Sequence, residues 1–246
     1  MPGLAQLLVV VALSGVGAFV QGATGLGYGL VVAPGLFAAL EPRQALYATL
    51  CSALVLNGLM LVGTRPVVRG RAAGVALVWA GPGFIAGAAV IGRITRPHLQ
   101  VAVGIAVVAT VLARAWHPGV IADGPRRWVV RAVAGLTAGV LTTTISSNGP
   151  PLALWLDAEG VRGREMRDTL QVLFAGFNLA GVGALAFHEL PRASTAAVGA
   201  LLLPGLVAGL IAGRRLEPRL APATARRLAL AVICATGAGS VLAGLL

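Results

Sequence analysis

The chain of 246 residues is 57% hydrophobic and only 11% charged, and its mean hydropathy is +0.88. An ordinary soluble domain carries about 25% charged residues, so this composition excludes that class and indicates an integral membrane protein. All nineteen basic residues are arginines, and the net charge is +11. Arginines between hydrophobic spans set orientation and contact anionic headgroups, so they point to membrane lipid and not to nucleic acid.

Ten apolar tracts follow one another along the chain. They run at about residues 4–22, 28–40, 44–63, 72–92, 98–115, 128–144, 149–157, 166–187, 193–213 and 227–246. Most are close to the roughly 20 residues that a helix needs to cross the hydrocarbon core, which predicts an all-α, polytopic transmembrane helical bundle. The second and seventh tracts are too short to cross. The first tract has no basic residue before it, so we expect a retained span instead of a cleaved signal peptide.

The two short tracts occupy matching places in an internal repeat. A shift of 120 residues places Thr24 on Thr144 and Thr49 on Thr169. Further along, PGFIAGAAVIGR from Pro82 matches PGLVAGLIAGR from Pro204 with one residue deleted. The sequence therefore predicts two membrane repeats, at 1–120 and 121–246, which is typical of a transporter fold built by duplication.

The arginines predict how the two repeats are oriented. Fifteen of the nineteen fall in loops on one side of the expected bundle, and only Arg43, Arg93, Arg96 and Arg192 fall on the other. Cytoplasmic loops collect arginine, so we expect both termini to be non-cytoplasmic. Each repeat then has an odd number of crossings, which makes the two repeats inverted.

Each repeat begins with a helix that is broken or re-entrant. VQGATGLGYGLVVAP starts at Val20, and its counterpart SSNGPPLALWL starts at Ser146. Prolines cannot donate backbone hydrogen bonds and glycines favour non-helical conformations, so both stretches interrupt a helix. Non-helical backbone at membrane depth needs protein or water to satisfy it, which predicts a cavity at the bilayer middle that the two breaks share.

The chemistry of the breaks favours an anion. A helix that starts after each break directs the positive end of its dipole into the cavity, and the breaks hold neutral donors but no carboxylate. The candidate binding residues are Gln21, Thr24, Gly25, Tyr28, Thr144, Ser146, Ser147, Asn148 and Gly149 in the breaks, with Asn57, Gln171 and Asn178 nearby on later helices. Helix packing through small polar residues is the alternative role for each of them.

Other residue types give no sign of catalysis or cofactors. The three histidines lie at tract edges far apart in sequence, so neither a metal site nor a catalytic base is expected, and no cofactor is indicated. Cys51 and Cys234 are interpreted as core residues, and Trp116, Trp128 and Trp155 as interface anchors. His188 and Glu189 end a tract, where an interfacial position and a proton relay are both open.

Three motifs carry a resemblance to a known family. The break that ends in VVAP, the stretch NGPPLALWL and the downstream RDTLQVLFAGFNLAG resemble the TauE/SafE sulfite exporter family over nearly the whole chain. The resemblance implies transport of sulfite, an organosulfonate or another small anion across a bacterial inner membrane. A pattern such as GxGGG is common in the family's breaks, whereas the second break here reads TTISSNGPP.

The sequence therefore predicts a secondary transporter, an exporter, of a small sulfur oxyanion held between the two breaks. A membrane-embedded enzyme and a non-transporting accessory subunit are the alternatives. The expected partners are the anion and membrane lipid. The coupling ion and a homo-oligomeric state stay open.

Overall fold

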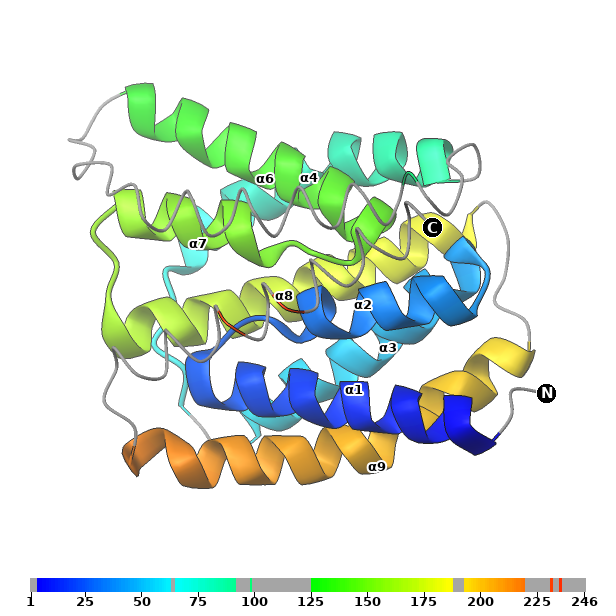
Figure 1. Cartoon of the computed structure of the whole chain (residues 1–246). Coiled ribbons are helices and arrows are strands. Elements are labelled where there is room, and N and C mark those ends of the chain that lie inside the picture. The colour runs from blue at the N-terminus through cyan, green and yellow to red at the C-terminus, as the bar shows by residue number, and fades with distance from the viewer. Residues whose placement is uncertain are drawn as a thin grey trace.

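The computed structural model describes residues 4–62, 65–91, 125–187 and 193–219, with isolated positions at 98, 231 and 235. Throughout this part of the chain the regular elements are helices. They are α1 (Leu4–Thr24), α2 (Tyr28–Ala39), α3 (Pro42–Leu61), α4 (Gly70–Ile91), α6 (Pro125–Ile145), α7 (Gly149–Ala158), α8 (Gly163–Ala186), α9 (Ala193–Leu216) and the 3-10 turn η1 (Glu217–Arg219). Figure 1 shows the helices side by side as one bundle.

The all-α, polytopic prediction is confirmed. Among the described residues, α3, α4, α8 and most of α6 and α9 are long and apolar enough to cross a membrane. The two short tracts form α2 and α7, of 12 and 10 residues. At 1.5 Å per residue these helices extend only about 15–18 Å, less than the roughly 30 Å hydrocarbon core. The tracts at 98–115 and 227–246 lie almost wholly outside the described residues.

The order of helix lengths recurs in the two halves. Each half has a long helix, a short one and two further long ones, as α1–α4 and as α6–α9. Packing between the halves is reciprocal, because α1 packs on α9 and α4 packs on α6. The equivalent helices α3 and α8 are antiparallel: Asp168 and Thr169, early in α8, accept hydrogen bonds from the backbone N–H of Val67 and Arg69, just beyond α3.

Each short helix begins at a break, and α2 folds back along α1. A Cβ added at Gly17 would lie 2.9 Å from Val32, and one added at Gly35 would lie 2.2 Å from Leu13, so α1 and α2 form a hairpin. The turn between them uses Gly25 and Gly27 at φ 85° and 123°, a region that side chains disfavour. The second break includes Ser146 at φ 54°. The short tracts are therefore separate helices that follow a tight turn.

The reciprocal pairs pack backbone against backbone. A Cβ added at Gly209 of α9 would lie 2.0 Å from the carbonyl oxygen of Gly15 in α1, and one added at Gly139 of α6 would lie 2.5 Å from that of Ala80 in α4. Small residues permit this approach, which is the usual way for membrane helices to gain van der Waals contact. The glycine content thus serves helix pairing as well as the breaks.

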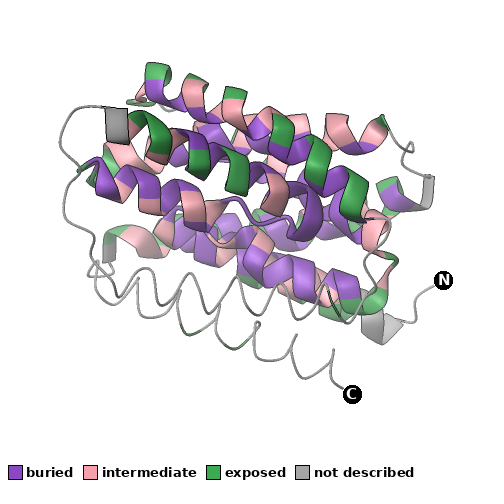
Figure 2. Cartoon of the chain, turned by 90° about the horizontal axis from the view of Figure 1, so that it is seen from above, coloured by how far each residue is buried: buried purple, intermediate pink, exposed green. Residues whose placement is uncertain are grey.

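Burial follows the pattern of a bundle that sits in lipid. Figure 2 shows buried positions along the inner faces of the helices and exposed positions on the outer faces. Large apolar residues are among the exposed ones, such as Val78 and Ile85 of α4, which are 74% and 67% exposed. The short helices α2 and α7 each belong to one of two buried apolar clusters. The breaks are therefore held inside the bundle.

Candidate functional site

The two breaks meet around one small cavity. A Cβ added at Gly29, in the first turn of α2, would lie 2.0 Å from the carbonyl oxygen of Ser146 in the other break. The cavity between them is about 30 Å³, which is room for about two water molecules at roughly 10–15 Å³ each. It is lined by Gln21, Leu26, Gly27, Tyr28, Gly29, Leu30, Ala53, Asn57, Ser146, Ser147, Asn148, Gly149, Phe174 and Asn178.

A chain of amides determines which atom of Asn57 faces this cavity. The backbone N–H of Tyr28 donates to Gln21 Oε1 at 3.1 Å, which fixes the orientation of the Gln21 amide because a backbone N–H can only donate. Gln21 Nε2 in turn donates to Asn57 Oδ1 at 2.6 Å. Asn57 Nδ2 is buried without a hydrogen-bond partner. The network therefore leaves a donor, and not an acceptor, at this part of the wall.

Gln171 supports the same orientation from the α8 side. Its Nε2 donates to the carbonyl oxygen of Gly25 at 2.7 Å, which leaves its Oε1 to accept from Gln21 Nε2 at 3.3 Å. The Gln21 oxygen is thus fixed by the backbone N–H of Tyr28, and its nitrogen is held by the side chains of Asn57 and Gln171, of which Gln171 is oriented by the carbonyl oxygen of Gly25. Gln171 does not line the cavity itself, so its place is behind the wall that Gln21 forms.

The second half supplies donors in another way. Asn148 Nδ2 donates to Asn178 Oδ1 at 3.3 Å, so Nδ2 is the remaining polar atom of Asn178. The hydroxyls of Ser146 and Ser147 are buried without hydrogen-bond partners, and both residues line the cavity. Buried polar groups are rarely left unpaired in folded proteins. These hydroxyls, together with Asn57 Nδ2, are therefore available to a ligand.

The N-termini of two helices add positive electrostatic potential at the cavity. The first residues of α2 and α7, Tyr28 and Gly149, both line the cavity, so the positive ends of two helix dipoles lie there. Pro150 and Pro151 follow Gly149 and have no N–H, so side chains at the second break replace backbone donors. Among the described residues, no Asp or Glu lines the cavity.

The structure brings eight of the twelve candidate residues to the cavity wall. The other four are Thr24, Gly25, Thr144 and Gln171. Thr24 Oγ1 donates to the carbonyl oxygens of Val20 and Leu26 at 2.8 and 2.9 Å, and Thr144 Oγ1 donates to that of Val140 at 2.8 Å. Both threonine hydroxyls are therefore bonded within their own segment of the chain. The glycines and apolar residues of the wall carry no polar group that marks them in the sequence, although Phe174 lies between Gln171 and Asn178 at helical spacing.

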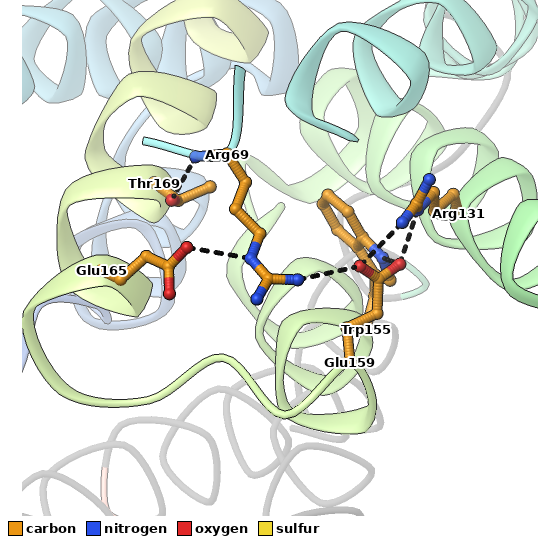
Figure 3. Close-up of polar contacts among 6 residues, drawn as sticks. All are labelled: Arg69, Arg131, Trp155, Glu159, Glu165 and Thr169. Atoms are coloured by element: carbon orange, nitrogen blue, oxygen red, sulfur yellow. Dashed lines mark hydrogen bonds and ion pairs between the residues drawn. The ribbon is translucent and has the colours of Figure 1, made fainter. Parts of the chain in front are cut away.

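A cluster of charges lies at the end of α7, as Figure 3 shows. Arg131 binds Glu159 through Nε and a terminal nitrogen at 2.5 and 2.9 Å, and Trp155 Nε1 donates to the same carboxylate at 2.6 Å. Arg69 approaches Glu159 at 3.7 Å and pairs with Glu165 at 2.9 Å. Burial alone would raise the pKa of Glu159, but its hydrogen bonds from Arg131 and Trp155 outweigh this effect and lower it. The cluster fixes α7 to α6 and to the loop before α4.

Two predictions are wrong, one for Trp155 in this cluster and one for Cys51 in α3. Trp155 is 1% exposed and packs inside the bundle, so its interpretation as an interface anchor is wrong. Trp128 is 51% exposed, as an anchor would be, and stacks edge-on against Trp79. Cys51 is exposed and not in the core. Cys234, Trp116, His188 and Glu189 lie outside the described residues.

Comparison with known proteins agrees with these features. The family model described as sulfite exporter TauE/SafE matches residues 9–239. A relative from Cupriavidus necator, described as a probable sulfite/organosulfonate exporter TauE, is 27% identical over 97% of this chain and 95% of its own length. No solved structure matched the chain.

Proposed function

Because the chain belongs to the TauE/SafE family, whose members are membrane transporters and not enzymes, we propose that it exports a small sulfur oxyanion. The ion is sulfite or an organosulfonate, and it binds in the cavity between the two breaks. One observation carries this proposal: the amide network leaves Asn57 Nδ2 as an unpaired buried donor at the wall. The relative from Cupriavidus necator supports the same substrate class through its description.

The donors favour negative charge for a physical reason. Asn57 and Asn178 have their carbonyl oxygens occupied by protein donors, so these two residues offer a ligand their nitrogens, and Ser146 and Ser147 offer unpaired hydroxyls. Each helix dipole that ends at the cavity contributes about 0.3–1 kcal/mol to an anion, and up to about 2 kcal/mol when partly buried. A cation site within a membrane would ordinarily recruit a carboxylate. This wall has none.

The bundle supports transport by alternating access between two inverted repeats, 1–120 and 121–246. Reciprocal packing of α1 on α9 and of α4 on α6, together with antiparallel α3 and α8, is the geometry expected of such repeats. The substrate site then lies where the repeats meet, and rocking of one against the other exposes it to either side. The plasma membrane is the location that fits an exporter of this kind.

Flux in proteoliposomes tests the proposal. The wild-type protein is expected to carry sulfite or methanesulfonate and not Na⁺. Ser147→Ala removes an unpaired hydroxyl, so its thermal stability should equal or exceed that of the wild type. Its affinity for the anion should fall at least about tenfold, because a hydrogen bond to a charged group contributes about 1.5–3 kcal/mol.

Thr142→Val is the matched control. The Thr142 hydroxyl donates to the carbonyl oxygen of Ala138 within α6, and Thr142 does not line the cavity. Its removal should leave anion affinity unchanged. A preference for a cation in the wild type, or equal anion affinity in wild type and Ser147→Ala, contradicts the proposal.

A further inference from the structure

One face of α8 leads from the cavity toward the arginine-rich end of the bundle. Asn178 and Phe174 line the cavity, Gln171 holds the first break, and Arg167 comes next on the same face. These residues are three or four positions apart, so they stack along one side of the helix. At 1.5 Å per residue, Arg167 lies about 10 Å from the level of Phe174 and about 16 Å from that of Asn178.

Arg167 sits directly behind the first break. Its guanidinium donates to the carbonyl oxygen of Gly22, in the last turn of α1, and pairs with the carboxylate of Glu217 in η1. Its Cγ lies 3.1 Å from the position that a Cβ on Gly25 would take. The Arg167 side chain is 23% exposed and that of Glu217 is 39% exposed. The ion pair is thus reachable from solution at one side and touches the break at the other.

The two repeats differ at this position. A shift of 120 residues places Arg167 on Tyr47, which is neutral and 3% exposed. The first half therefore has no cation at the equivalent place on α3. Because equivalent positions of inverted repeats lie on opposite sides of a membrane, Arg167 gives its side of the pathway a positive charge that Tyr47 does not give the other side.

We propose that Arg167 is a second anion-binding station, on the side of the arginine-rich loops, at which the transported oxyanion replaces the Glu217 carboxylate. The inference rests on the proposed function. An arginine presents its donors in a planar fork that fits a carboxylate and a sulfur oxyanion alike, so Glu217 occupies the place of the substrate in this structure. A positive charge at the mouth of a cleft also concentrates the anion there.

Release of Glu217 has a further consequence for the pathway. The same guanidinium holds the Gly22 carbonyl oxygen, and Gly22 lies three residues before Gly25. An anion that draws the guanidinium away from both partners loosens the turn between α1 and α2. The station therefore couples arrival of the ion to movement of the first break.

The test uses variants of both partners in proteoliposomes of known orientation. Glu217→Gln removes the competing carboxylate, so the KM for sulfite at the arginine-rich face should fall about two- to fivefold, the range of a partly exposed ion pair. Arg167→Gln should raise this KM about tenfold or more, because a charge-assisted contact is lost. Arg167→Lys keeps the positive charge but lacks the planar fork of donors, so its KM should lie between those of the wild type and Arg167→Gln.

The matched control is Asp157→Asn, which removes a carboxylate from the pair of Asp157 with Arg162 near the same end of the bundle. It should leave the KM unchanged. If Arg167 has only a structural role, Glu217→Gln should lower the thermal stability of the protein or leave its transport unaltered. An unchanged or raised KM in Glu217→Gln, with sulfite flux in the wild type intact, overturns the station. Absence of sulfite flux in the wild type refutes the proposed function instead.

Discussion

Glu159→Gln should destabilise the protein, because it removes the carboxylate at the centre of a buried cluster. The Glu159 side chain is 1% exposed, and its carboxylate accepts hydrogen bonds from Arg131 at 2.5 and 2.9 Å and from Trp155 at 2.6 Å. Removing one partner of a buried ion pair costs about 3–5 kcal/mol, because the other charge stays buried. Arg131 is 22% exposed, so water offsets part of this cost. The glutamine oxygen can also still accept from Trp155, so we expect a loss of about 2–4 kcal/mol.

Thermal unfolding in detergent measures this loss. A protein of this length loses about 2–4 °C in Tm per kcal/mol, so the expected decrease is about 4–16 °C. Glu165→Gln is the matched control, since Glu165 shares Arg69 with Glu159 but its side chain is 35% exposed. An exposed pair contributes about 0–1 kcal/mol, so the control should lose at most about 4 °C. If Glu159→Gln costs no more than Glu165→Gln, the buried cluster does not stabilise α7.

The effect should also depend on pH in a definite direction. Burial raises the pKa of Glu159, but the hydrogen bonds from Arg131 and Trp155 outweigh this effect, so the pKa lies below its usual 4.5. A carboxyl whose pKa is lower in the folded state stabilises that state above the unfolded pKa and loses this contribution as the pH falls through the folded pKa. The Tm difference between the wild type and Glu159→Gln should therefore stay constant at neutral pH and shrink only below 4.5.

Three further predictions concern the breaks and the topology. Gly29→Ala places a Cβ against the Ser146 carbonyl oxygen and should cost about 1–3 kcal/mol and reduce flux, whereas Gly81→Ala, with open space around it, should do neither. Gln21→Leu frees the Asn57 amide to turn its oxygen toward the cavity, so anion affinity should fall in a binding assay, and Tm should fall as well because the backbone N–H of Tyr28 loses its acceptor. Cysteine labelling should find both termini outside the cytoplasm, and a cytoplasmic terminus would contradict the inverted arrangement.

The breaks could be predicted from sequence because their chemistry is local. Pro150 and Pro151 cannot continue a helical ladder, and Gly25 and Gly27 occur where the chain adopts positive φ. The repeat then placed α2 and α7 in equivalent positions without any knowledge of contacts. The arginine distribution predicts that both termini are non-cytoplasmic, because cytoplasmic loops collect arginine, and cysteine labelling is the test of this prediction.

Side-chain direction and long-range pairing could not be predicted in the same way. A threonine on a helix can bond the carbonyl oxygen four residues before it, and both Thr24 and Thr144 do so, which takes their hydroxyls away from the cavity. Glu159 lies in a polar stretch between apolar tracts, where a charge is ordinarily solvated. Its burial depends on Arg131, 28 residues earlier, and on Arg69, which no local pattern connects to it.

Whether the cavity wall offers donors or acceptors also depends on side-chain pairings that sequence cannot show. Asn57 lies in α3, and Asn178 lies in α8 one position after Phe177, the residue that a shift of 120 places on Asn57. An asparagine offers a donor and an acceptor alike. In the first half Gln21 occupies the carbonyl oxygen of Asn57, and in the second half Asn148 occupies that of Asn178. The position equivalent to Gln21 is Leu141, so the two halves reach the same outcome with different partners. In both halves a protein donor thus occupies an asparagine oxygen, and these two pairings are what supports the proposed donor character of the site.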